Sequence, residues 1–294
     1  MNAFTIRDLE NLSGIKAHTI RIWELRYSFL KPKRSNTNIR YYDSEELKKL
    51  LNVALLNRYG YKISHISKMD QHTVSDKILS LTSTEAQQER IINELLHGMI
   101  DLDTEEFESI LDKYIRENGI DNTINNLIFP FMQRIGILWL TDHVRIAQEH
   151  LVSNVIRQKL IMGIENTRAA HKQAERTILL FLPEGEHHEL GILYVYYLLR
   201  TSGVKVIYLG ADVPVSELEY VCKAKSPTFL FTHLTSLPPR FNMENYLNTL
   251  QKHLAHCTIV MSGRVIQQYS KKIPPNVRFK KSLEEVMAEL YGTT

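Results

Sequence analysis

In the last part of the chain, residues 176–294, strand patterns alternate with helix patterns. This alternation restricts the possible folds more than any other feature of the sequence. Short apolar runs typical of strands occupy residues 177–182, 204–209, 228–232, 258–261 and, more weakly, 277–279. Helical patterns accompany them at residues 188–200, 216–224 and 282–290. Because strands that alternate with helices form parallel sheets, we predict a doubly wound α/β domain. No Gly-x-Gly-x-x-Gly motif follows the first strand, which disfavours a dinucleotide site.

A polar loop follows the first predicted strand and contains Glu186, His188 and Gly191. In a parallel sheet, such a loop lies at the carboxyl edge, where ligands bind. An imidazole near a carboxylate suits a metal ligand whose tautomer the acid fixes, and the glycine permits close approach. The alternative is a solvated loop that binds nothing, because His and Glu are common on surfaces. The motif therefore predicts a candidate metal site around His188.

Two short helical patterns joined by a glycine open the chain. Thr5 and Asp8 form a capping box ahead of a first helix, Gly14 ends it, and a second helix is expected over residues 17–27 with Ile20 and Trp23 inward. Two extended pieces around an Asn-rich turn add a basic wing, so residues 1–70 predict a winged helix-turn-helix. The side chains expected to contact double-stranded DNA are Lys16, His18, Thr19, Arg21, Arg26, Lys33, Arg34, Arg40 and Tyr41. The alternative is a helical module with a solvated basic face.

Four successive helical patterns occupy the middle of the chain. They begin near residues 83, 104, 121 and 142, with short breaks between them, and predict a four-helix bundle over residues 83–175. Residues 71–82 are polar and are expected to form a linker. Trp139 ends the third helix, and Glu149 and His150 lie in the fourth, so these side chains can converge over a large planar ligand. The alternative is a core tryptophan with two surface residues.

The bulk composition is that of an ordinary soluble protein. Of the 294 residues, 44% are hydrophobic and 23% are charged, and the net charge is +3. These values predict two or three domains with a sizeable core. No stretch has the length of a membrane span, and the N-terminus lacks the pattern of a secretory signal. We therefore expect a multidomain α and α/β protein in the cytoplasm, without a membrane partner.

The first domain resembles the winged-helix DNA-binding domain of MerR-type transcription regulators. The similarity covers residues 4–69 and includes Gly14-Ile15, Thr19-Ile20-Arg21, Trp23-Glu24, Arg26-Tyr27, Leu30-x-Pro32-x-Arg34 and Arg40-Tyr41-Tyr42. Lys16 and Ala17 stand where the family more often has a Ser-Pro helix start. The resemblance implies a homo-oligomer, a dimer or tetramer, on promoter DNA. The family's long dimerising helix is not obvious in this sequence.

The last domain resembles the Rossmann-like cobalamin-binding domains of methionine synthase and base-off mutases, whose signature is Asp-x-His-x-x-Gly. Here the motif is Glu186-x-His188-x-x-Gly191, with Thr232-x-Leu234 and Ser262-Gly263 at the family's later positions. The resemblance implies that His188 is the lower axial ligand of cobalt and that Glu186 orients it. It also implies that the cofactor's tail passes Gly191, Thr232, Leu234 and Gly263.

The middle segment is similar to the light-responsive cobalamin regulators of the CarH and LitR type. In both, a tryptophan, here Trp139, is followed after nine residues by Glu149-His150. This resemblance implies that the helical bundle caps the cofactor, with Trp139 over the 5′-deoxyadenosyl group of adenosylcobalamin. Glu149 and His150 would offer hydrogen bonds to that group or to the corrin. Leu140 stands where the best-understood members have a histidine that captures cobalt after photolysis.

Three functions fit these patterns. The leading interpretation is a DNA-binding transcription regulator, not an enzyme, whose DNA affinity or assembly is controlled by cobalamin bound between the bundle and the Rossmann-like domain. Adenosylcobalamin is the favoured form, and light is a candidate signal. The second is a MerR-type regulator whose sensor domain no longer binds cobalamin and serves for oligomerisation or another ligand. The third is a corrinoid enzyme or carrier, which is disfavoured because a DNA-binding module replaces any substrate barrel.

Overall fold

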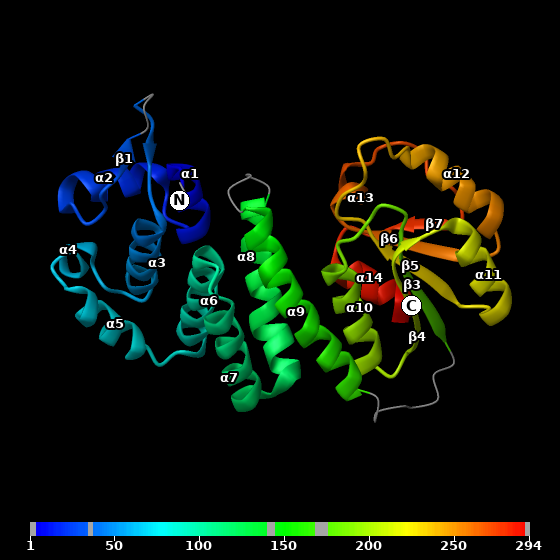
Figure 1. Cartoon of the computed structure of the whole chain (residues 1–294), viewed down its shortest axis with the longest axis horizontal. Helices are drawn as coiled ribbons and strands as arrows, with labels where there is room; N and C mark the ends of the chain where they lie inside the picture. The colour runs from blue at the N-terminus through cyan, green and yellow to red at the C-terminus, as the bar shows by residue number, and fades with distance from the viewer. Residues whose placement is uncertain (1–3, 35–37, 140–144, 168–175, 292–294) are drawn as a thin grey trace. The chain divides into compact units, whose positions relative to one another are not determined.

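The computed structural model describes residues 4–34, 38–139, 145–167 and 176–291, with the backbone alone for residues 137–139. The chain forms two compact units, Met1–Ile156 and Arg157–Thr294. Figure 1 follows the elements of both units along the chain. Within the described parts of the chain, no helix combines the length and apolar character that crossing a membrane requires.

The first unit begins with the expected winged helix. The helices α1 (Ile6–Ser13) and α2 (Ala17–Tyr27) are joined at Gly14, whose positive φ of 73° ends α1. The strands β1 (Lys33–Arg34) and β2 (Arg40–Tyr41) pair antiparallel and form the wing. Ile20 and Trp23 of α2 are buried, as their spacing predicted. The helices α3 (Ser44–Arg58) and α4 (Ile63–Ile66) complete the module.

The segment expected to be a linker contains a regular helix, α5 (Gln71–Leu79). The side chain of Asp70 caps it by accepting a hydrogen bond of 2.7 Å from the backbone amide of Thr73. Its one buried residue is Ile78, and the helix packs against α3. Only three of its residues, Val74, Ile78 and Leu79, are apolar, and so short a pattern gives little periodic signal.

Helices α6 (Thr84–Asp101), α7 (Thr104–Thr123), α8 (Phe129–Trp139) and α9 (Ile146–Asn166) follow in the predicted order. α7 is kinked at Gly119, whose φ of 79° and ψ of 163° are not helical, where the sequence predicted a complete break. One wide turn, η1 (Ile124–Ile128), connects α7 to α8. α6 packs against both α7 and α8, and the rings of Phe107 and Phe131 meet edge to face at 5.4 Å. The division between the two units falls within α9.

The second unit contains a parallel sheet of five strands in the order β4-β3-β5-β6-β7. The strands are β3 (Thr177–Pro183), β4 (Lys205–Val213), β5 (Phe229–His233), β6 (Thr258–Ser262) and β7 (Val277–Phe279). From β3 the chain first builds β4 on one side and then returns to build β5 on the other, so the topology switches between β3 and β5. In doubly wound sheets, ligands bind outside the carboxyl ends of the strands at such a point.

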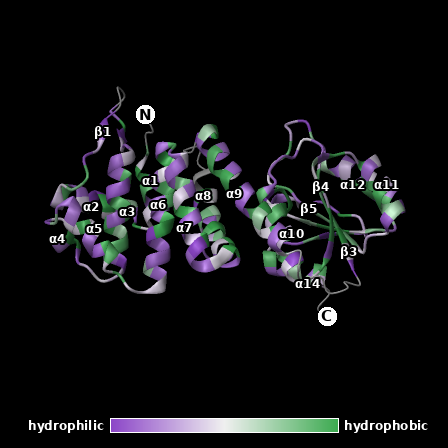
Figure 2. Cartoon of the chain, turned by 60° about the horizontal axis from the view of Figure 1, so that its bottom comes forward, coloured by the Kyte–Doolittle hydropathy of each residue, from purple (hydrophilic) through white to green (hydrophobic). Residues whose placement is uncertain are grey.

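Helices cover both faces of this sheet, as predicted. α10 (Leu190–Thr201) and α14 (Leu283–Tyr291) pack on the face that carries Ile178 and Leu180. α11 (Val215–Lys225), α12 (Met243–Leu254) and α13 (Arg264–Gln268) pack on the face that carries Leu179 and Phe181. Figure 2 shows the strands β3 and β5 as largely hydrophobic, which suits strands buried on both faces. The helix α12 was not among the predicted elements.

Candidate functional site

Glu186 is the central residue at the carboxyl edge of the sheet. It follows β3, and its side chain is fully buried. One carboxylate oxygen, Oε2, accepts hydrogen bonds of 2.8 Å from the backbone amides of Thr235 and Ser236, which follow β5. The other oxygen, Oε1, accepts one of 2.9 Å from the backbone amide of His188. Glu186 therefore fastens together the two loops that flank the switch point.

The carboxylate of Glu186 also holds the ring of His188. Oε1 lies 2.6 Å from Nδ1 of the imidazole, and the hydroxyl of Ser236 lies 3.3 Å from the same nitrogen. Burial alone would raise the pKa of Glu186, but the hydrogen bonds from His188 and from the backbone of His188 and Ser236 outweigh it and lower that pKa. Glu186 is thus an anion at neutral pH that orients the imidazole.

The ring of His188 is half exposed, with a side-chain exposure of 45%. Because Nδ1 faces Glu186, Nε2 is the nitrogen that the geometry offers to a metal ion. His188 precedes α10, whereas the sequence placed it at the start of that helix. In the described part of the chain, no three His, Cys, Asp or Glu side chains gather as a metal cage. The arrangement therefore suits a metal that brings most of its own ligands.

The loops after β5 and β6 bring three further predicted residues close together. Thr232 and Leu234 are fully buried at the end of β5. Gly263 has a φ of 106°, and a Cβ atom there would overlap the backbone of Leu234. Position 263 therefore requires glycine. The hydroxyl Oγ1 of Thr232 is buried and has no hydrogen-bond partner among the described residues.

Gly191, the last residue of the predicted motif, lies against the ring of His233. A Cβ atom at position 191 would lie 2.5 Å from Cδ2 of that ring. Nδ1 of His233 is 2.9 Å from the hydroxyl of Ser262, and burial lowers the pKa of His233. The motif Thr232-x-Leu234 leaves position 233 variable, so the sequence does not single out His233. Its one signal was a polar residue at the carboxyl end of a buried strand next to the switch point.

Two of the three predicted residues of the helical region, Glu149 and His150, lie near the start of α9. Glu149 is half-buried and His150 is exposed. Their neighbour Gln148 is the buried one: its Oε1 accepts a bond from the amide of Arg145, and its Nε2 donates one to the carbonyl of Ile100. Gln148 therefore anchors the start of α9, a role that the sequence did not reveal. The side chain of Trp139 lies outside the described residues, as do Leu140 and His143.

The predicted DNA-binding residues lie on α2, on the residue before it, and on the wing. Most of the set is exposed: Lys16, His18, Arg21, Arg26, Lys33, Arg34 and Arg40; Thr19 and Tyr41 are half-buried. Three of the cations are paired, since Lys16 lies 3.2 Å from Glu10, Lys33 2.9 Å from Asp43 and Arg40 3.7 Å from Glu24.

Two other cations of this surface, Arg21 and Arg26, have no ion pair within the described ranges. The phenol of Tyr42 donates a bond of 2.8 Å to Glu24 and so links the wing to α2. The sequence pattern includes Tyr42 but does not reveal this positioning role. The surface can present cations to a phosphate backbone.

Comparisons with known proteins match two stretches of the chain to family models and most of its length to two curated relatives. Residues 4–73 match the MerR HTH family regulatory protein, and residues 91–162 match the B12 binding domain. The chain is 26% identical to the HTH-type transcriptional repressor CarA of Myxococcus xanthus over 290 residues, which cover 96% of this chain and 94% of CarA. It is 25% identical to the repressor CarH of the same organism over 257 residues, 85% of each chain.

Among solved structures, the monomethylamine corrinoid protein of Methanosarcina barkeri is similar, with a TM-score of 0.53 and 15% sequence identity. That match covers 70% of this chain and 100% of the corrinoid protein, and it concerns the fold alone. The family matches and the two repressors confirm the resemblance to MerR-type regulators that carry a cobalamin-binding domain.

Proposed function

We propose that this chain, which joins a MerR-type helix-turn-helix to a B12-binding region, is a DNA-binding transcription regulator controlled by cobalamin. The two family matches and the similarity to two repressors over most of the chain support this function. The proposed DNA-contacting surface is the exposed face of α2 together with the wing. Binding as a dimer or tetramer, as the resemblance implies, is part of the proposal.

The proposed cobalt ligand is His188, acting through Nε2. The observation that carries this assignment is the fully buried Glu186, which holds Nδ1 at 2.6 Å and fixes the ring at the switch point of the sheet. A corrin supplies four nitrogen ligands itself, which suits a site where one imidazole is offered. The buried hydroxyl of Thr232, without a partner in the described ranges, is a polar group that a bound tail could satisfy. Leu234 and Gly263 would line the same path.

A bound tail would have to change the surroundings of Gly191. The ring of His233 covers it and bonds to Ser262. Passage of a tail beside Gly191 would require this ring to turn away. We therefore include His233 among the proposed cofactor-site residues, although no motif assigned it.

Adenosylcobalamin is the proposed form of the cofactor, and light is the proposed signal. The bound form would supply a cobalt–carbon bond that light can break. Trp139, Glu149 and His150 are proposed to contact its upper side, as the resemblance implies. The half-buried Glu149 and exposed His150 stand in the first turns of α9, which Gln148 anchors to α6. A change at this end of α9 could therefore reach the helical unit.

The experiment that tests the function is an absorption spectrum of the full chain, purified in the dark after incubation with adenosylcobalamin, before and after green light. We expect a retained corrin spectrum that changes on illumination and is lost in His188→Ala. His187→Ala is the matched control, because His187 is the exposed neighbour in the same loop. This control should retain the cofactor.

Two other outcomes would redirect the assignment. If no cobalamin is retained, the alternative interpretation holds: the chain is a MerR-type regulator whose sensor domain serves for oligomerisation or binds another ligand. If His188→Ala retains cobalamin with an unchanged spectrum, His188 is not the lower ligand. Retention without any response to light would leave cobalamin as the effector and remove light as the signal.

A further inference from the structure

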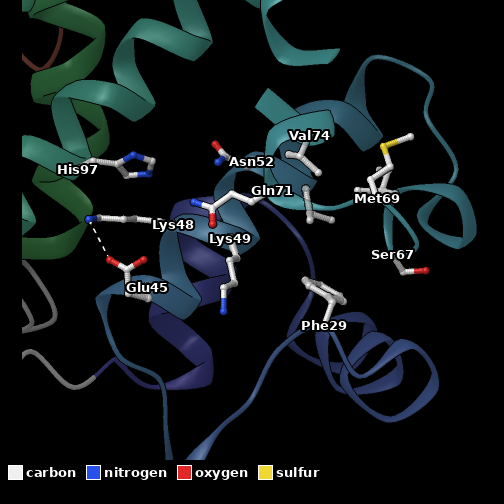
Figure 3. A pocket seen from close by; sticks show the side chains of 12 residues that line it. Phe29, Glu45, Lys48, Lys49, Asn52, Ser67, Met69, Gln71, Val74 and His97 are labelled. Carbon is white, nitrogen blue, oxygen red and sulfur yellow. Dashed lines mark hydrogen bonds and ion pairs between the residues drawn. The ribbon is translucent and has the colours of Figure 1, made fainter. Parts of the chain in front are cut away.

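We propose that a pocket in the first unit is a second ligand site, for a small neutral molecule with an apolar ring and one hydroxyl group. The pocket lies between α3, α4, α5 and α6 and has a volume of about 280 Å³. Figure 3 shows the side chains that line it. The volume is close to the lower end of the range of about 300–1,000 Å³ found for small-molecule pockets. The proposal goes beyond the function proposed above and does not depend on cobalamin.

One wall of the pocket is apolar. Phe29 follows α2, Val53 belongs to α3, Ile66 to α4 and Val74 to α5, and Met69 lies between α4 and α5. Figure 3 shows Phe29, Met69 and Val74 arranged around the same space. A flat apolar ring fits such a wall, because methionine sulfur and aromatic edges make favourable contacts with rings.

The rest of the lining is polar and consists of Glu45, Lys48, Lys49, Asn52, Ser67, Gln71 and His97. Nε2 of His97 on α6 is buried and has no hydrogen-bond partner in the part of the chain that the structure describes. Figure 3 shows this ring above Lys48. Burial, helped by the charge of Lys48, lowers the pKa of His97 to about 4. The imidazole is therefore neutral near pH 7. A turn of the ring toward the pocket would expose Nε2, and a ligand hydroxyl could then donate to it or accept from it.

The charges of this polar lining are compensated, which favours a neutral ligand. Lys48 is paired with Asp101 and, at 3.2 Å, with Glu45. Lys49 lies 2.7 Å from Glu46. An anionic ligand would have to compete with these carboxylates, and a cationic ligand would meet two lysines. A neutral molecule with a single polar group leaves all three ion pairs intact.

The pocket reaches the helix that carries the proposed DNA contacts. The ring of Phe29 lies 6.2 Å from that of Trp23, and Trp23 is one of the two buried residues of α2. A ligand that touches Phe29 therefore contacts a residue that supports α2. The proposed site is placed to influence the orientation of that helix.

Calorimetric titration of the full chain with 4-methylphenol and, separately, with toluene tests the proposal. Both probes have an apolar ring, but toluene lacks the hydroxyl. We expect one 4-methylphenol site per chain and an affinity about fivefold above that for toluene, the typical effect of one neutral hydrogen bond. His97→Phe should remove this preference. His72→Phe, which changes an exposed histidine, should keep it.

A second pair of variants tests the location. Val74→Phe should fill the pocket and abolish binding of both probes, whereas Leu79→Phe, on the exposed end of the same helix, should leave binding unchanged. Circular dichroism confirms that each variant is folded. Absence of saturable binding, equal affinity for the two probes, or unchanged binding by folded Val74→Phe would overturn the proposal. A change of oligomeric state in Val74→Phe without probe binding in the parent chain would assign the pocket to a second copy instead.

Discussion

The winged helix and the sheet edge hold their candidate functional groups in opposite ways. In the winged helix, the cations lie on one helix and one hairpin, and they project from a core that they do not build. At the sheet edge, the groups come from loops that follow β3, β5 and β6, and the buried Glu186 fastens two of these loops. A substitution in the winged-helix surface should therefore change binding alone, whereas one at the sheet edge should also change stability.

Gly263→Ala should give the largest effect, because it breaks the sheet edge directly. Gly263 has a φ of 106°, and an added Cβ atom would overlap the backbone of Leu234. Strain and overlap together should lower the free energy of unfolding by about 4 kcal/mol. Hydrogen exchange of the β5 and β6 amides, followed by mass spectrometry, measures this loss in the sheet unit.

Gly60→Ala is the matched control in the other unit. Gly60 also has a positive φ, 96°, but a Cβ atom there would meet nothing within 4 Å. Backbone strain alone should cost about 1 kcal/mol. Both tryptophans, Trp23 and Trp139, belong to the first unit, so urea unfolding followed by tryptophan fluorescence reports on this variant. Equal losses at the two glycines would contradict the contrast between the units.

Glu186→Gln should have the next largest effect. The substitution keeps the shape of the side chain but removes its negative charge. In the parent chain this carboxylate accepts hydrogen bonds from three backbone amides and lies 2.6 Å from Nδ1 of the His188 ring. We expect the sheet unit to lose about 3 kcal/mol, since charge-assisted hydrogen bonds are the strong ones. Hydrogen exchange of the amides of Thr235 and Ser236 should accelerate. Glu184→Ala, an exposed change in the same loop, should alter stability by about 0.5 kcal/mol or less.

The same variant should change how stability depends on pH. Because folding lowers the pKa of Glu186 below its ordinary 4.5, its contribution is present above that value and is lost as the pH falls through the lowered pKa. Glu186→Gln should remove this acid-dependent loss of stability in the sheet unit. If the variant unfolds in acid at the same pH as the parent chain, other carboxylates cause the loss.

The sequence predicted the sheet edge less completely than the winged helix, because the residues in contact at the sheet edge lie far apart in sequence. Glu186 and His188 lie close together in sequence, so their pairing could be anticipated. The amides that Glu186 binds belong to Thr235 and Ser236, 49 and 50 residues further along. That contact depends on the strand order, in which β3 and β5 are neighbours. A motif that spans six residues cannot contain it.

Local signals explain what could be predicted in the winged helix and what could not. Thr5, Gly14, Ile20 and Trp23 act within one or two turns, and each has the role that its position indicated. α5 escaped prediction because it is short and only three of its residues, Val74, Ile78 and Leu79, are apolar. The pocket beneath it, lined from four helices, has no counterpart in any local pattern.

His97 provides a smaller test, through a pH dependence in the helical unit. Its pKa is lowered from an ordinary 6.5 to about 4, so the unfolded chain binds the proton more readily than the folded chain between these values. Stability should therefore fall as the pH decreases, by about 1.5 kcal/mol between pH 6.5 and about pH 5. Tryptophan fluorescence reads this change in the first unit. His97→Phe should remove it, and His72→Phe, at an exposed position, should not.

The smallest effect on stability, and a clear one on binding, is expected for Arg21→Ala. Arg21 is exposed on α2, and no ion pair holds it within the described residues. If α2 enters a major groove as proposed, this substitution should weaken DNA binding about tenfold. It should also lower the slope of log affinity against log salt concentration by about one, the amount expected for one lost phosphate contact. The free energy of unfolding should change by about 0.5 kcal/mol or less.

Lys16→Ala is the matched comparison on the same surface. Lys16 already lies 3.2 Å from Glu10, so part of its charge is compensated and DNA affinity should fall by about threefold or less. Gel-shift titrations with duplexes selected from a random pool, at two salt concentrations, measure both variants. If Lys16→Ala weakens binding as much as Arg21→Ala, the ion pair with Glu10 does not persist on DNA. If neither variant weakens binding, α2 is not the recognition helix, and the surface of the winged helix has the solvated role that its composition also allowed.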